Sequence, residues 1–109
     1  MLQLRFEERR GALVVTPLVR RLDAEVAPEL RDVVGAAVAG RRLVVLSLGH
    51  VRVADASGLA ALVAVLKRLP PGGELRLAEV APRVAALLAL TRLDEVFPTY
   101  EDASSAVPA

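Results

Sequence analysis

The sequence predicts a single α/β domain, in which one mixed β-sheet of four to five strands carries about four helices packed on it. Three observations lead to this fold class. Short apolar runs with β-branched centres, typical of buried strands, alternate with amphipathic stretches typical of helices. Clusters of proline and glycine separate these segments. The length of 109 residues suits one domain over 1–109 rather than two.

The chain opens with a predicted β-hairpin. Residues 2–7 alternate between apolar and polar side chains, as in a half-exposed edge strand. After a polar turn, residues 12–16 form the second strand, and Pro17 ends its ladder because proline cannot donate to it. Residues 18–22 continue as a short extended segment. The apolar face of the first strand would carry Leu2, Leu4 and Phe6.

The first helix is predicted between Leu22 and Gly40. Pro28 fits a first helical turn, where its missing N–H costs nothing, and Gly40 is a natural stop. Acidic residues crowd the beginning of this segment, as the helix dipole favours. Apolar residues at helical spacing predict a buried face made of Val26, Leu30, Val33, Val34, Ala37 and Val38.

The centre of the predicted fold is the stretch 43–69. Residues 43–48 are almost wholly apolar, which predicts a strand buried on both faces. Residues 57–69 follow as a helix, and the prolines and glycines over 70–73 end it. The apolar stripe of this helix consists of Leu59, Leu62, Val63, Leu66 and Leu69.

The remaining segments complete the alternation of strands and helices. Residues 75–78 form another strand, and a third helix begins near Pro82. Residues 93–98 make a short turn with room for one more strand, and 100–106 form a final short helix. The order is typical of a mixed sheet with helices packed on it. The buried stripe of the third helix would be Val84, Leu87 and Leu88.

The composition argues against several classes of function. The net charge is +1, with 14 basic and 13 acidic residues in mixed order, whereas nucleic-acid binding usually needs a concentrated basic face. No apolar run approaches the ~20 residues that cross a bilayer, and the first residues lack the apolar core of a signal peptide. The absence of cysteine fits a reducing compartment. We expect a cytoplasmic protein that neither binds nucleic acid nor inserts into a membrane.

The residues needed for catalysis are also missing. His50 is the only histidine, and the sequence places no partner group beside it for acid–base chemistry. Neither a glycine-rich phosphate loop nor a metal-ligand cluster is present. A nucleophilic Ser57 would need a general base that the sequence does not offer. The sequence therefore predicts no enzyme, no metal site and no cofactor.

A short polar hinge, Asp55-Ala56-Ser57-Gly58, connects the central segment to its helix. Asp and Ser are preferred at helix starts because their oxygens accept from backbone N–H groups that lack partners. The helix dipole also favours a negative group there, including a phosphate on a serine. Gly58 carries no side chain, so another backbone or a nucleotide can come close. Two interpretations stay open: a plain helix cap, or a site offered to a phosphate or a partner.

The outward face of the following helix is small and uncharged, with Ala60, Ala61 and Ala64. A solvated helix face normally carries more charge, so a flat surface beside the hinge indicates docking. Alanine is also the best helix former. Both explanations of this face stay open.

The chain resembles the STAS domain, which bacterial anti-sigma factor antagonists share. The resemblance is carried by residues 43–51 and by the hinge with the first turns of its helix, 55–62. Residues 22–30 look like the start of that family's first helix. Residues 90–97 and the tail over 100–106 look like its C-terminal blocks. Their order and spacing match over nearly the whole chain.

The resemblance implies a partner-switching protein with a STAS-like fold. In that family the domain binds an anti-sigma factor that is also a serine kinase, which frees the sigma factor. The kinase phosphorylates a hinge serine, the complex dissociates, and a phosphatase restores the domain. We expect a monomer or weak dimer. The partner-binding residues would be Asp23, Asp55, Ala56, Ser57, Gly58, Leu59, Ala60, Ala61 and Ala64.

The hinge departs from the family pattern at one position. The family's usual hinge is Asp-Ser-Ser/Thr-Gly, and the phosphorylated serine directly follows the aspartate. Here that position is Ala56, so Ser57 is the phosphorylation candidate. One residue along a helix is a rotation of ~100°, so a kinase aimed at 56 would not automatically reach 57. The alternatives are a constitutively active protein, or a non-phosphorylated accessory subunit of a lipid-transport ATPase complex or stress-signalling assembly.

Overall fold

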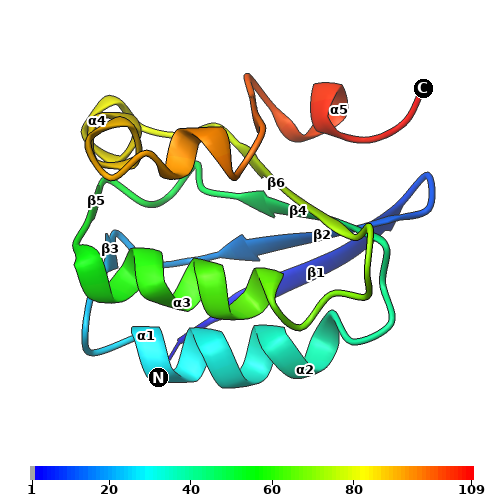
Figure 1. Cartoon of the computed structure of the whole chain (residues 1–109), viewed down its shortest axis with the longest axis horizontal. Helices are drawn as coiled ribbons and strands as arrows, with labels where there is room; N and C mark the ends of the chain where they lie inside the picture. The colour runs from blue at the N-terminus through cyan, green and yellow to red at the C-terminus, as the bar shows by residue number, and fades with distance from the viewer. Residues whose placement is uncertain (1) are drawn as a thin grey trace.

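A five-stranded mixed sheet forms the centre of the fold (Figure 1). The computed structural model describes residues 2–109, and its main sheet has the strand order β1-β2-β4-β6-β7. The first two strands are antiparallel and the later neighbours are parallel, so the predicted mixed sheet is confirmed. The strands are β1 (Leu4–Arg9), β2 (Ala12–Pro17), β4 (Leu43–Ser47), β6 (Glu74–Ala78) and β7 (Thr99–Tyr100).

The central strand β4 is buried as its composition predicts. It lies between β2 and β6, and Val44 pairs with Leu13 on one side and Leu75 on the other. Only Leu43 at its start is partly exposed. A strand covered on both faces needs apolar side chains throughout, which explains the continuous apolar run.

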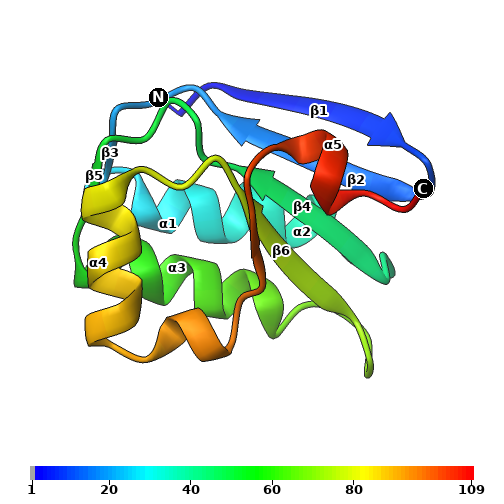
Figure 2. The same ribbon diagram turned by 90° about the horizontal axis from the view of Figure 1, so that it is seen from above.

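One face of the sheet carries most of the helices (Figure 1). The first helical stretch consists of α1 (Ala27–Glu29), a π-helical segment (Leu30–Val34) and α2 (Gly35–Ala37), and α3 (Ala56–Leu66) packs beside it. Figure 2 shows α4 (Pro82–Leu90) closing one end of this layer. Among residues 2–109, no helix combines the length and the apolar character needed to cross a bilayer.

A single short helix covers the other face of the sheet (Figure 2). After a 3₁₀ turn at Leu93–Glu95 and the strand β7, the chain forms α5 (Ala103–Ala106). Its Ala106 packs on a small apolar cluster that includes Val14 and Val45. The guanidinium of Arg76 fixes this helix by donating to the carbonyl oxygen of Ala106 at 2.7 Å. The same guanidinium lies over the ring of Tyr100, 5.3 Å from its centre.

The predicted buried face of the first helix is wrong at two positions. Val33 is 43% exposed and Ala37 is also exposed, whereas Leu30, Val34 and Val38 are fully buried. The cause is the π-helical segment, whose turn contains more residues than an α-helical turn. Leu30, Val34 and Val38, which are four residues apart, therefore all point toward the core. Val33 and Ala37 lie between them and point to solvent.

The predicted first strand also needs correction. It spans Leu4–Arg9 rather than 2–7, and Phe6 is 41% exposed instead of buried. The reason is that β1 lies at one edge of the sheet (Figure 2), so its outer part extends beyond the layer of helices.

A second, two-stranded ladder forms where the sequence indicates only extended segments. β3 (Arg21–Leu22) and β5 (Val53–Ala54) pair in parallel, with Arg21 opposite Val53 and Leu22 opposite Ala54. Leu22 is fully buried. This ladder lies at the end of the molecule where α3 begins (Figure 1), and it places β3 against the first turn of that helix.

Candidate functional site

Asp55 begins and caps α3. Its Oδ1 accepts a hydrogen bond from the backbone N–H of Gly58 at 3.1 Å, and its carbonyl oxygen accepts the N–H of Leu59 at 3.1 Å. The carboxylate thereby satisfies one of the N–H groups that a helix start leaves without partners. The capping interpretation of Asp55 is confirmed.

Replacing Asp55 with alanine is expected to lower the free energy of unfolding by about 1 kcal/mol, because the N–H of Gly58 loses its acceptor. Asp55→Asn keeps an acceptor oxygen and should retain most of the stability. Urea denaturation of both variants beside the wild type measures the difference. Equal midpoints for the wild type and Asp55→Ala would show that the cap contributes nothing.

Gly58 is buried against the chain's own backbone rather than open to a partner. A β-carbon at this position would overlap the carbonyl oxygen of Leu22. The N–H of Asp55 donates to that same carbonyl at 3.1 Å, so β3 is held directly on the first turn of α3. The prediction that Gly58 contributes to a partner-binding surface is therefore wrong. The close approach that glycine permits here is made by Leu22.

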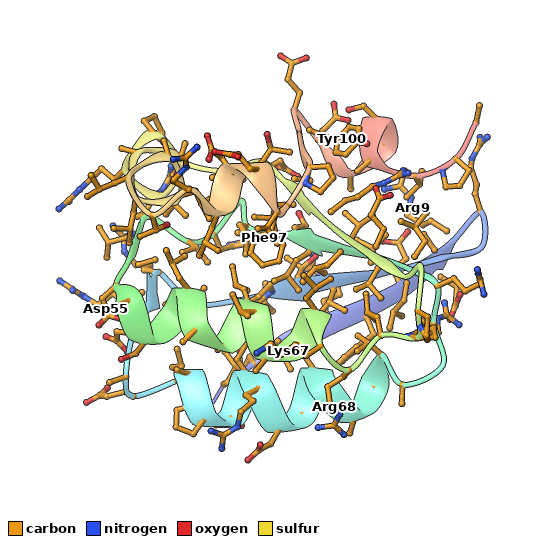
Figure 3. The ribbon with its side chains drawn as sticks, in the orientation of Figure 1. Arg9, Asp55, Lys67, Arg68, Phe97 and Tyr100 are labelled. Carbon is orange, nitrogen blue, oxygen red and sulfur yellow. The ribbon has the colours of Figure 1, made fainter. Side chains whose placement is uncertain are left out.

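A groove with a volume of about 490 Å³ runs between α1 and α3. Most of its lining side chains are methyl groups, so its surface is mostly apolar, with Ser57 as its one hydroxyl and Arg31 as its one charge. In Figure 3 the labelled charged residues next to α3 lie at the two ends of this helix. Asp55 precedes its first turn, and Lys67 and Arg68 follow its last turn. The groove is lined by Ala24, Ala27, Pro28, Arg31, Ser57, Ala60, Ala61 and Ala64.

The structure brings four of the predicted site residues together in this groove. Ser57 and Ala60 are exposed, Ala64 is half-buried, and Ala61 is 3% exposed and so forms part of the floor. The alanine face that the sequence suggests for docking is therefore part of a real groove on the surface. Docking of a partner in this groove stays a prediction.

The other predicted residues lie elsewhere. Leu59 is 2% exposed and packs in the main core, so its assignment to a partner-binding surface is wrong. Leu59 belongs to the apolar stripe of α3, and this stripe faces the core. Ala56 is exposed at the first position of α3 but does not line the groove. Asp23 lines a neighbouring hollow instead.

Sequence reasoning missed one whole wall of the groove. Ala24, Ala27, Pro28 and Arg31 come from the first helical stretch and the turn before it. The only signal in the sequence is the small size of the alanines, which fits many other roles. The wall becomes visible only when α1 packs beside α3.

The one charge in the groove belongs to an exposed ion pair. The Arg31 Nε donates to Oδ1 of Asp32 at 2.9 Å. This hydrogen bond raises the pKa of Arg31 and lowers the pKa of Asp32. Both side chains are exposed, so the pair is weak and the guanidinium is free to exchange Asp32 for another anion.

No cluster of three or more histidine, aspartate or glutamate side chains that could hold a metal ion occurs within residues 2–109. The groove instead offers the hydroxyl of Ser57 and the guanidinium of Arg31 beside an apolar floor. An apolar floor beside polar groups is the combination found at contacts between proteins, where the apolar part is buried by the partner.

Comparisons of the sequence with known proteins find relatives along nearly the whole chain. The sequence model of the STAS domain family matches residues 3–106. An anti-sigma F factor antagonist of Paenibacillus polymyxa is 31% identical, over 97% of this chain and 92% of that protein.

Two solved structures of similar proteins cover nearly the same length. An anti-sigma factor antagonist from Mycobacterium paratuberculosis has a TM-score of 0.85 at 27% identity, over 97% of this chain and 91% of that one. An anti-sigma-factor antagonist (STAS) domain protein from Planctomyces limnophilus has a TM-score of 0.88 at 25% identity, over 97% and 95%. The likeness in fold therefore extends over nearly the whole chain.

Proposed function

The chain belongs to the STAS domain family, and we propose that it acts as an anti-sigma factor antagonist whose partner docks in the groove between α1 and α3. One observation carries this proposal: a largely uncharged groove has the exposed Ser57 among its lining residues. An apolar segment of an anti-sigma factor would bury the methyl groups of this groove. The anti-sigma factor bound in this way would release the sigma factor, and this release would be the regulatory output.

Phosphorylation of Ser57 would switch this interaction off. A phosphoserine adds about −1.5 to −2 charges, and in this position the charge would stand in a groove that the partner must cover. The partner would be repelled, whereas the domain itself would tolerate the phosphate because Ser57 lies in the first turn of α3. Ser57 carries the one hydroxyl of the hinge, since Ala56 occupies the preceding position.

The domain would have two protein partners in this cycle. The anti-sigma factor would act as the serine kinase, a phosphatase would remove the phosphate, and the domain would work as a cytoplasmic monomer or weak dimer. The exposed side chain of Ser57 supports access for both enzymes.

Ser57→Asp is expected to weaken binding of the anti-sigma factor at least about tenfold, because a carboxylate in the groove must be desolvated or repelled. Ser57→Ala removes only a hydroxyl and should bind within about twofold of the wild type. Isothermal titration calorimetry with the purified anti-sigma factor from the same organism measures both constants. Incubation of the wild-type complex with ATP, followed by phosphopeptide mapping, should place the phosphate on Ser57.

Three outcomes of this experiment would contradict the proposal in different ways. Absence of any complex with the wild-type protein would reject the antagonist function. Normal binding by Ser57→Asp would keep the function and reject the switch. Phosphate on a different residue would reject Ser57 as the acceptor.

A second candidate function rests on Ala56. With no hydroxyl directly after Asp55, the chain lacks the family's usual acceptor, which suits an accessory subunit that is never phosphorylated. The partner would then be a lipid-transport ATPase complex or a stress-signalling assembly. Co-purification of the tagged protein with an ATPase, without a phosphorylated form, would favour this candidate.

A further inference from the structure

A second hollow, with a volume of about 560 Å³, lies beside the groove and is rich in arginine. We call it the arginine hollow. Four guanidinium groups and two carboxylates line it, together with three valines. Its residues are Val19, Arg20, Arg21, Asp23, Glu25, Val26, Arg52, Val53 and Arg83.

The ladder between β3 and β5 gathers these arginines from distant parts of the chain. Arg21 pairs with Val53, and the backbone N–H of Arg52 donates to the carbonyl oxygen of Arg20 at 2.8 Å. Helix α4 contributes Arg83 from a third segment. In Figure 1, β3, β5 and α4 lie together at the end of the molecule where α3 begins.

Within residues 2–109, the four arginines of the hollow have no carboxylate partner. Arg20, Arg21, Arg52 and Arg83 are all exposed, and none of them takes part in an ion pair among residues 2–109. The carboxylate of Asp23 instead accepts the backbone N–H of Glu25 at 3.1 Å. The hollow therefore carries more positive than negative charge, although the net charge of the whole chain is only +1.

The arginine hollow adjoins the groove through a single turn. Ala24 lines the groove, whereas its two neighbours Asp23 and Glu25 line the hollow. A protein that covers the groove and reaches past this turn would meet the guanidinium groups. Arginine is well suited to such a contact because its planar fork binds carboxylates through two hydrogen bonds.

We propose that the arginine hollow binds acidic side chains of the same protein partner that docks in the groove. This inference rests on the proposed function and adds the chemistry of the partner: a segment in which glutamate or aspartate alternates with apolar residues. The carboxylates would pair with the arginines, and the apolar side chains would pack on Val19, Val26 and Val53. Such complementarity sets the specificity and the rate of association.

The decisive variant is Arg52→Glu/Arg83→Glu, which reverses two charges from different segments of the hollow. We expect the anti-sigma factor to bind at least about tenfold more weakly at 50 mM salt, with a weaker dependence of binding on salt up to 300 mM, because screened charge pairs are removed.

Arg5→Glu/Arg42→Glu is the matched control, since both residues are exposed, outside the hollow and free of ion pairs among residues 2–109. The control should stay within about threefold of the wild type. Equal effects of the two variants would overturn the inference and leave the proposed function intact.

A second measurement tests the hollow without the anti-sigma factor. The probe is a hexapeptide of alternating glutamate and leucine, added to the isotope-labelled wild-type protein and followed by NMR. Amide signals of 19–26, 52–53 and 83 should shift, and the same peptide with glutamine in place of glutamate should leave them unmoved. Absence of these shifts, or the same shifts with inorganic phosphate alone, would overturn the inference. This result stands even if no complex with an anti-sigma factor forms.

Discussion

Replacing Gly58 with alanine is expected to lower the free energy of unfolding by about 3 kcal/mol, the upper part of the range for overpacking. Alanine normally favours a helix over glycine by about 1 kcal/mol, so the sign of the expected change is opposite to helix propensity. The physical reason is that the added β-carbon would overlap the carbonyl oxygen of Leu22, a backbone atom that cannot rotate away. The midpoint of thermal unfolding should fall by more than about 10 °C.

Gly35 provides the matched control for this prediction. It is also a buried glycine in a helix, but the nearest atom to its added β-carbon, at 3.2 Å, is the terminal nitrogen of the Arg68 side chain. Arg68 is exposed, and rotation about its side-chain bonds can move this end away, so Gly35→Ala should be neutral or stabilising by up to about 1 kcal/mol. A Gly58→Ala protein as stable as Gly35→Ala would contradict the packing of β3 on α3.

The second large effect is expected from Ala60→Gln/Ala64→Gln. The two longer side chains would fill the groove without changing its charge, and we expect the anti-sigma factor to bind at least about 100-fold more weakly, a loss of about 2.7 kcal/mol. Glutamine is close to alanine in helix propensity, and Ala60 is exposed while Ala64 is half-buried. The fold should therefore persist, which circular dichroism can verify.

The control for the groove is the same change on another helix. Ala85 and Ala89 are exposed on α4, four residues apart, and neither lines the groove. Ala85→Gln/Ala89→Gln should bind like the wild type. If both double variants bound normally, the docking surface would have to lie outside the groove.

The sheet was predictable from sequence because its signals are local. Residues 43–48 are almost wholly apolar. A strand that lies between two other strands and is covered by helices is surrounded by apolar groups, so this composition indicates its position. The proline and glycine residues over 70–73 likewise end the helical segment that contains α3, independently of its packing partners. The buried face of the first helix was less predictable, since the π-helical segment at Leu30–Val34 changes the angular spacing on which the prediction depends.

The site was predictable only in part, because its surroundings come from distant residues. The hinge and Ala60, Ala61 and Ala64 are adjacent in sequence, and the structure places the alanines with Ser57 in one groove. Gly58 was misjudged because Leu22, which covers it, lies far away in sequence. The arginine hollow had no sequence signal at all. Its arginines occur in three separate segments, and the adjacent Arg20 and Arg21 are typical of an ordinary solvated turn, whereas Arg83 lies in a helix.

The packing of Leu22 on Gly58 has a consequence for how tightly a partner could be held. This contact joins the strand that carries Arg21 to the helix that carries Ser57, so the groove and the arginine hollow are kept at a constant spacing. A ligand anchored in one would find the other at a high effective concentration, without a flexible linker to dilute it. Two contacts that are each weak would then combine into one durable association, and loss of either would shorten its lifetime severely.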